Sequence, residues 1–376
     1  GTTRALVLAP TRELALQIAY GSASMAAKGY GVPEVEKAYA RARELCQQLG
    51  ETPQIFPVLV GLNRIYSARA ELHTARELGA HCVTLAQRTS DPSLLVEAHR
   101  ALGTTLYFLG ELISAQSHLE QIIPLYEPHQ DHSLALFYVI DPAVSGLSYL
   151  AWALWLLGYP DQALKRSQEA LVLAQELSHP FSLSVAQMFS PVLYQFRQEW
   201  QMTQERAEEG VTLATEWGFV SGPLPWGMVL RGWALSEQGQ REEGITQIRQ
   251  GMAAWRATGA EVGRTHFLAL LAEAYGKAEQ VEEGLQLLTG ALELVDKSGE
   301  RFYEAELCRL KGMLTLQKFH VSSSTFQVPP SPQPLAPSTQ AGMREAEEYF
   351  LKAIAIAQKQ QAKSWELRAS MSLARL

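Results

Sequence analysis

The chain has 376 residues, 47% of them hydrophobic, and a net charge of −7 that arises from interspersed acidic and basic side chains. This length is enough for a sizeable core, and the charge pattern excludes the basic surface typical of nucleic-acid-binding proteins. No run of about 18 uncharged apolar residues occurs, so we expect no membrane span.

The N-terminal residues carry no secretory signal and begin with glycine, which predicts a cytoplasmic protein or a fragment of a larger one. Cys46, Cys82 and Cys308 are scattered and odd in number. They are expected to be buried thiols of a reducing compartment, not a disulfide framework.

Residues 1–11 are predicted to form a leader of uncertain structure. The stretch ALVLAPTRELALQI at residues 5–18 resembles motif Ia of DEAD-box helicases, in which PTRELA contacts the nucleic-acid backbone. The chain has neither a GxxxxGK[ST] phosphate loop nor a DEAD tetrapeptide, so ATP-driven unwinding is excluded. Thr11 is expected to cap a helix that begins at Arg12.

From residue 12 onward the sequence repeats one unit, a pair of amphipathic helices joined by a tight turn. The unit is clearest at Leu147–Leu177, where Gly158 and Pro160 mark the turn and the start of the second helix. One hairpin cannot bury both apolar faces, so it requires neighbours of the same kind. The predicted pairs are 12–28 with 33–49, 54–68 with 72–87, 93–109 with 111–126, the unit 147–177, 181–196 with 200–217, 225–237 with 241–255, 264–277 with 281–297, and 301–317 with 342–358, and 362–376 begins a ninth.

Small residues mark the close-packing face of each second helix, with a period close to 40 residues. These markers are Ala38, Ala75, Ala115, Ala163, Thr203, Gly244, Gly284 and Ala346. Two insertions interrupt the period, one near residues 129–142 and one at about 320–341, where five prolines among Ser, Thr and Gln predict a disordered loop. We therefore expect an all-α, right-handed α-solenoid of about eight hairpins across residues 12–376.

The repeat resembles the tetratricopeptide repeat, through Leu102-Gly103-x2-Leu106, Leu271-Ala272-x2-Tyr275 and Ala346-x3-Phe350. More narrowly, several phrases resemble the C-terminal repeat region of bacterial class III adenylate/guanylate cyclases that are fused to a signal-transduction P-loop ATPase. These phrases lie at 28–51, 98–112, 154–171, 230–240, 270–285 and 360–376. The resemblance implies a sensory or regulatory arm, because neither the cyclase aspartates nor the phosphate loop has a counterpart here.

In tetratricopeptide solenoids the first helices line the concave surface, and this register gives the candidate binding residues. They are Arg100, Tyr107, Ser148, Trp152, Trp155, Met188, Gln195, Trp226, Trp233, His266 and Glu273, with Thr104, Val192 and Val229 at equivalent positions. Aromatic side chains with a few polar partners suit recognition of a peptide, a helix or a small stacked ligand. In a tightly curved superhelix the same positions would instead pack against one another. A ligand with a terminal carboxylate is not favoured, because Arg100 and Arg309 have no matching Asn residues.

No nucleophile–base constellation can be assembled from the sequence, so we expect no enzymatic activity, cofactor or metal. His129-x2-His132 with Asp131 has metal-like spacing but lacks a third ligand. The sequence therefore predicts a non-catalytic tetratricopeptide-like module that binds a protein, a peptide or a small ligand. An upstream ATPase or cyclase domain is one candidate partner. The alternative is a self-associating scaffold without a small ligand.

Overall fold

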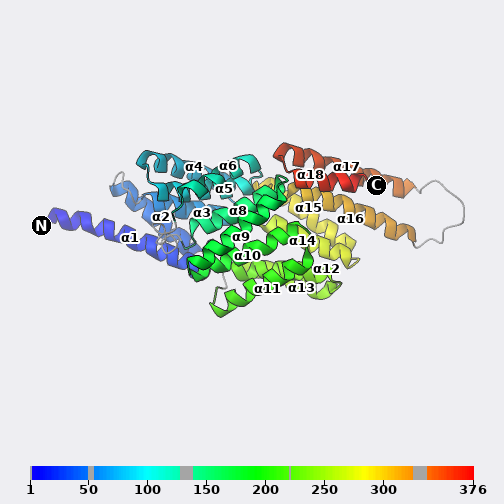
Figure 1. Cartoon of the computed structure of the whole chain (residues 1–376), viewed down its shortest axis with the longest axis horizontal. Coiled ribbons are helices and arrows are strands. Elements are labelled where there is room, and N and C mark those ends of the chain that lie inside the picture. Colours follow the sequence, from blue (N-terminus) through cyan, green and yellow to red (C-terminus); the bar gives the residue numbers. More distant parts are fainter. Residues whose placement is uncertain (1, 50–54, 128–138, 220–221, 325–336) are drawn as a thin grey trace, which may run out of the picture.

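The computed structural model describes residues 2–49, 55–127, 139–219, 222–324 and 337–376, and this part of the chain contains helices and no strand. The helices form antiparallel hairpins that stack side by side into a curved array (Figure 1). In chain order they are α1 (Thr2–Lys28), α2 (Pro33–Leu49), α3 (Ile55–Ala68), α4 (Leu72–Thr89), α5 (Pro92–Phe108), α6 (Leu112–Leu125), α8 (Pro142–Leu156), α9 (Pro160–Glu176), α10 (Pro180–Phe196), α11 (Trp200–Glu216), α12 (Pro223–Glu237), α13 (Arg241–Ala257), α14 (Arg264–Lys277), α15 (Val281–Ser298), α16 (Glu304–Ser324), α17 (Pro337–Gln360) and α18 (Lys363–Leu373). The predicted all-α solenoid of about eight hairpins is confirmed.

Proline and capping residues define many of the helix starts. Asp91 accepts hydrogen bonds from the backbone N–H groups of Ser93 and Leu94 at the start of α5, and Asp141 does the same for Ala143 and Val144 at the start of α8. In each case a proline follows the cap, where its missing N–H costs nothing. The capped start at Asp141 explains why α8 begins before the predicted Leu147.

Two predicted boundaries differ from the structure. Helix α1 begins at Thr2, so residues 2–11 belong to the first helix and Thr11 lies inside it instead of capping it. Helices α16 and α17 extend to Ser324 and back to Pro337, so they take up both ends of the loop predicted at about 320–341. The remainder of that loop, residues 325–336, lies outside the described residues, as does the His129–His132 pair.

The predicted close-packing register is visible where the two helices of a hairpin meet. A Cβ atom on Gly232 would lie 2.7 Å from the carbonyl oxygen of Gly244, so only hydrogen fits between α12 and α13. At the equivalent place in the second hairpin, Asn63 Nδ2 donates to the carbonyl of Ala75 at 2.8 Å. Small residues at these slots let the two backbones approach, as the sequence pattern indicates.

The array curves so strongly that successive turns of the superhelix touch. The carbonyl of Ala68, at the end of α3, accepts hydrogen bonds from Glu261 N at 2.7 Å and from Val262 N at 2.9 Å. One repeat further along the chain on each side of this contact, the carbonyl of Phe108 accepts a hydrogen bond from Arg301 N at 2.8 Å. Two repeats along, Ser364 Oγ donates to the carbonyl of Trp155. The ends of the first helices in hairpins two to four thus meet the loops that precede α14 and α16 and the first turn of α18.

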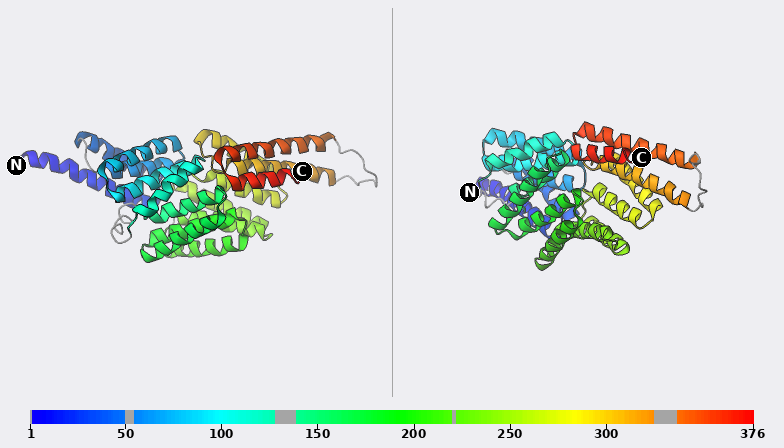
Figure 2. Two further views of the ribbon diagram at one scale, coloured as in Figure 1. Left: turned by 45° about the horizontal axis from the view of Figure 1, so that its top comes forward. Right: turned by 45° about the vertical axis from the view of Figure 1, so that its right-hand side comes forward.

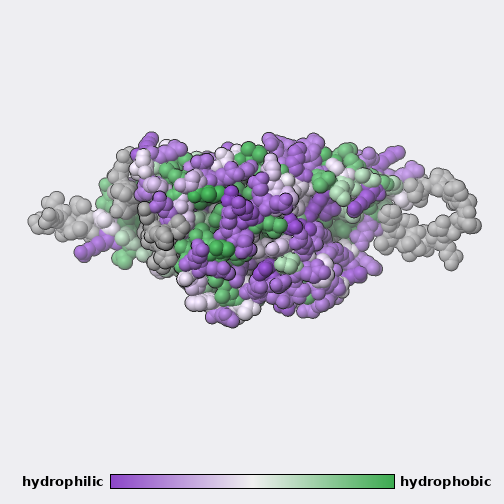
Figure 3. Space-filling model, in the orientation of Figure 1, coloured by the Kyte–Doolittle hydropathy of each residue, from purple (hydrophilic) through white to green (hydrophobic). Residues whose placement is uncertain are grey.

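The closed coil is elongated, with α1 projecting at one end and the α16–α17 hairpin at the other (Figure 2). The face seen in Figure 3 is covered largely by hydrophilic side chains, with hydrophobic ones scattered among them. Most large apolar side chains instead join one continuous core that runs through the first helices of the hairpins. The inner face of the coil is therefore where a ligand site has to be sought.

Candidate functional site: a pocket on the inner face

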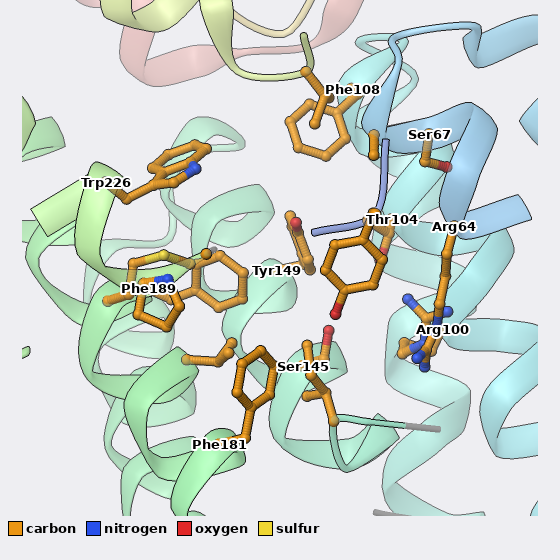
Figure 4. Close-up of a pocket in the computed structure, with 18 of the residues that line it drawn as sticks. Arg64, Ser67, Arg100, Thr104, Phe108, Ser145, Tyr149, Phe181, Phe189 and Trp226 are labelled. Carbon is orange, nitrogen blue, oxygen red and sulfur yellow. The ribbon is translucent and has the colours of Figure 1, made fainter. Parts of the chain in front are cut away.

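A cavity of about 130 Å³ remains on the inner face, between the first helices of five consecutive hairpins. It is lined from α3, α5, α8, α10 and α12, and Val262 and Trp255 close it from the following turn. Figure 4 shows two unlike walls: Arg64, Ser67, Arg100 and Thr104 lie on one side, and Phe181, Phe189 and Trp226 lie on the opposite side.

The polar wall is built around a buried ionic triad. Glu97 on α5 is fully buried and accepts hydrogen bonds from Arg100 Nε at 2.8 Å, Arg100 Nη2 at 2.6 Å and Arg64 Nη2 at 3.1 Å. Burial acts to raise the pKa of Glu97, but the two guanidinium groups outweigh it and hold the pKa below the ordinary value. Glu97 is therefore ionised, and the triad carries one net positive charge against the cavity.

Two hydroxyl groups beside this triad have buried oxygens without a hydrogen-bond partner. Thr104 Oγ1 and the Tyr30 hydroxyl belong to residues that line the cavity, and neither makes a hydrogen bond within the described part of the chain. Thr104 is only 7% exposed. Buried polar atoms in native proteins are almost always satisfied, so atoms left without a partner next to a cavity indicate a place for polar atoms of a ligand or of water.

The apolar wall is made of aromatic rings held by their neighbours. Phe189 lies 4.9 Å from Tyr149, centroid to centroid, and 4.6 Å from Trp152 behind it. Phe181 packs edge-on against Phe219 at 5.0 Å. Trp226 lies edge-on to Phe267 at 4.6 Å. These ring contacts hold Phe181, Phe189 and Trp226 at the edge of the cavity, which all three line.

Three of the residues predicted from the sequence line this cavity: Arg100, Met188 and Trp226. Trp152, Trp155, Trp233 and Tyr107 are instead buried in the core, so the packed alternative holds for them and not the open groove. Trp152 Nε1 donates to the carbonyl of Phe189 at 3.0 Å, and Trp233 Nε1 donates to Glu273 Oε2 at 2.8 Å. They are buried because the coil is too tight to leave a groove in front of them.

The other predicted residues are also occupied within the protein. Ser148 Oγ donates to the carbonyl of Val144 at 2.8 Å. His266 Nε2 lies 2.9 Å from Gln195 Oε1, and both side chains are fully buried. Burial lowers the pKa of His266 to about 3, so the ring is neutral and donates this hydrogen bond. None of these residues borders the cavity.

A second ionic triad occurs further along the coil, in the eighth hairpin. Glu306 accepts from Arg309 Nε and Nη2, each at 2.8 Å, and from Arg368 at 3.4 Å. Arg368 lies over the rings of Trp155 and Trp365, about 5 Å from each centroid. Here the space inside the coil is filled by the protein's own Trp365, which is 1% exposed. Glu-x2-Arg therefore recurs in one register; its first copy faces the cavity, whereas its second copy lies beside the buried Trp365.

Several lining residues were missed from the sequence. Arg64 precedes the marker Ala75 by the same number of residues as Thr104 precedes Ala115, so extending the register to the second hairpin would have found it. Tyr149 and Phe189 occupy the position next to the mapped Ser148 and Met188. Phe181 lies about two helical turns before Met188, near the start of α10, and no part of the mapped pattern indicated it.

In the described ranges, no group of three His, Cys, Asp or Glu side chains is arranged to hold a metal ion. Within those same ranges, every helix is too short or too polar to cross a bilayer.

Two solved structures share the architecture over almost their whole length. A Rap protein complexed with competence and sporulation factor superimposes with a TM-score of 0.56 at 11% identity, covering 94% of this chain and 99% of that one. NprR in complex with its cognate peptide NprX gives a TM-score of 0.53 at 11% identity, covering 96% and 98%. At such low identity the likeness concerns the fold alone, which is of the tetratricopeptide-repeat type.

No protein-family model matches the chain. Among curated sequences, an uncharacterized protein of Rhizobium meliloti (strain 1021) is 19% identical over 291 residues, which are 76% of this chain. The matched part is 28% of that protein, so the chain spans less than a third of the length of this relative.

Proposed function

We propose that this chain is a non-catalytic regulatory module that binds a peptide or a small ligand in the cavity on its inner face. The observation that carries the proposal is the pairing of a buried, positively charged wall with an aromatic wall around one cavity. Pockets of this composition, mostly apolar with a few placed polar groups, are typical ligand sites. The Rap and NprR structures support it, since both are named as complexes and share the fold.

The cavity borders a contact between turns of the coil, which provides a mechanism. Ala68 and Val262 both line the cavity, and the Val262 N–H donates to the Ala68 carbonyl at 2.9 Å. A ligand that fits the closed coil better than an opened one would stabilise this contact, and one that wedges the walls apart would weaken it. Binding would thus change how tightly successive turns of the superhelix are held together.

We further propose that the module serves a larger cytoplasmic signalling protein, such as an ATPase or a cyclase. The sequence phrases at 28–51, 154–171 and 270–285 support this context through their resemblance to cyclase-associated repeats. The curated relative, in which the matched stretch is 28% of the protein, is compatible with a module inside a longer chain.

The binding proposal is tested by filling the cavity. Val185 lines it and is buried, so Val185→Phe places a ring in the ligand space, while Val172→Phe makes the same change on an exposed face of α9. Affinity selection with a mixed pentapeptide library and a panel of small metabolites should retain compounds on the wild type and on Val172→Phe but not on Val185→Phe. Retention of nothing by the wild type, or the same compounds by all three proteins, would refute the proposal.

A second candidate function, self-association as a scaffold, is favoured by one surface. Leu367 and Met371 stand one helical turn apart on α18 and are 63% and 46% exposed. Light scattering at micromolar concentration should then show a dimer that Leu367→Glu dissociates. A monomeric wild type would exclude this function.

A further inference from the structure

The charge of the cavity wall restricts the charge of a ligand. Arg64 and Arg100 both pair with one carboxylate, Glu97, so these three groups together carry one net positive charge beside a cavity with aromatic walls. Arg100 uses Nε and Nη2 for Glu97, and no hydrogen bond to its Nη1 is found among the described residues. A guanidinium carries five N–H donors, so Arg100 keeps two for another acceptor. This wall is suited to a single negative charge.

The two unpartnered hydroxyls restrict the chemistry further. Thr104 Oγ1 lies on the same helix as Arg100, one turn away, and the Tyr30 hydroxyl is close enough to Arg64, Arg100 and Glu97 to interact with their charges. Burial raises the pKa of Tyr30 above its ordinary value, so this hydroxyl keeps its proton and donates. Guanidinium and hydroxyl donors together form an environment that a carboxylate can satisfy with both of its oxygens.

The size of the cavity limits the remainder of the ligand. A volume of about 130 Å³ is close to that of an engineered apolar cavity of about 150 Å³ that holds one benzene molecule. The rings of Phe181, Phe189 and Trp226 lie opposite the polar wall, as Figure 4 shows. One aromatic or branched aliphatic group therefore fills the apolar part.

We propose that the cavity binds a small monocarboxylate whose carboxylate pairs with Arg100 and Arg64 beside Thr104 and whose apolar group packs against Phe181, Phe189 and Trp226. This inference rests on the proposed function, because it names the chemistry of the ligand for the same cavity. A doubly charged phosphate ester would exceed the one charge that the wall offers. The carboxylate belongs either to a free small acid or to the C-terminal residue of a peptide, and the sequence-based argument against a terminal carboxylate is thereby revised.

Matched acid and amide probes test the charge requirement. Isothermal titration calorimetry would compare phenylacetate with phenylacetamide, and the peptide acetyl-Gly-Gly-Gly-Phe as its free acid with its C-terminal amide. We expect the wild type to bind at least one acid about 10-fold or more tightly than its amide, as charge-assisted hydrogen bonds in a buried site predict. Tighter binding by phenylacetate assigns a free acid, and tighter binding by the peptide acid assigns a peptide terminus. Equal affinities for acid and amide, or no binding of either acid at millimolar concentration, would overturn the inference.

Arg100→Gln should reduce the preference for the acid to threefold or less, while Arg206→Gln, at a half-exposed pair on α11, should preserve it. If Arg100→Gln does not fold, Thr104→Val keeps the test open, since it changes neither charge nor volume. Removing an unpartnered hydroxyl should raise the melting temperature of the empty protein and weaken acid binding several-fold. A full acid preference in folded Arg100→Gln, or unchanged acid affinity in Thr104→Val, would contradict the assignment.

The failure of this inference can be distinguished from the failure of the proposed function. If the wild type retains compounds that Val185→Phe does not retain, and acid and amide probes bind with equal affinity, the proposed function stands and only this inference is removed.

Discussion

Removing the shared carboxylate of the first ionic triad should destabilise the protein strongly. Glu97→Gln removes the negative charge that lies between the buried guanidinium groups of Arg64 and Arg100. Breaking a buried ion pair by removing one partner costs about 3–5 kcal/mol, and because Gln still offers one acceptor oxygen we expect about 3 kcal/mol. Unfolding entropy of about 2.1 cal/mol/K per residue over 376 residues converts this into a melting temperature lower by about 4 °C.

The assay is differential scanning calorimetry of Glu97→Gln beside Glu209→Gln, whose carboxylate pairs with Arg206 at 2.9 Å on the solvent-exposed side of α11. The exposed pair should contribute no more than about 0.5 kcal/mol. The pKa of Glu97 lies below its ordinary value of 4.5 because the arginines outweigh burial. Its stabilisation is therefore present above pH 4.5 and lost as the pH falls, so the difference between wild type and Glu97→Gln should shrink in acid. A loss below about 1 kcal/mol at pH 7 would show that Glu97 does not hold the two arginines.

Three further predictions concern the buried His266, the contact between the α1–α2 and α13–α14 loops, and Trp365 inside the coil. Burial lowers the pKa of His266 to about 3, against about 6.5 in the unfolded chain, so between these pH values the unfolded state binds more protons. The free energy of unfolding should therefore fall by up to about 1.4 kcal/mol per pH unit as the pH drops below 6.5. Urea unfolding of His266→Gln between pH 7 and 4 should lack this component. A Cβ on Gly31 would overlap the carbonyl of Gly259, so Gly31→Ala should separate the α1–α2 loop from the α13–α14 loop. The free energy of unfolding should fall by about 1–3 kcal/mol. An unchanged free energy of unfolding in urea would show that the two loops separate freely. Trp365→Ala should lower the free energy of unfolding by about 3–5 kcal/mol and open a cavity beside Arg368. Solvent would then reach the second ionic triad, and this should be measured as faster amide hydrogen exchange in α18.

Helix boundaries could be predicted from the sequence because local features determine them. Proline, capping Asp and turn glycine mark where helices start and stop. A small or turn-prone residue twelve positions before the small marker of the second helix indicates where the two helices of a hairpin approach, as at Asn63 with Ala75. The exceptions are local too: Pro10 was expected outside a helix, and α1 runs through it.

The candidate site could be predicted only in part, because its exposure depends on the curvature of the whole coil. The register predicted Arg100, Met188 and Trp226, which line the cavity, and it gave the same weight to Trp152 and Trp233, which are buried in the core. What separates the two groups is the contact between turns, made by hydrogen bonds such as Arg301 N to the Phe108 carbonyl. Residues that distant in sequence carry no periodic signal of their contact.

The contacts between turns also alter how the chain should unfold. In an open repeat array each unit interacts only with its neighbours, so the ends fray and the transition broadens. Here the second, third and fourth hairpins are hydrogen-bonded to the loop before α14, the loop before α16 and the first turn of α18, through the carbonyls of Ala68, Phe108 and Trp155. Loss of a hairpin on one side removes the support of a hairpin on the other. The two halves should therefore melt in one cooperative transition, and a ligand that stabilises the closed coil would protect helices far from the cavity as well as those that line it.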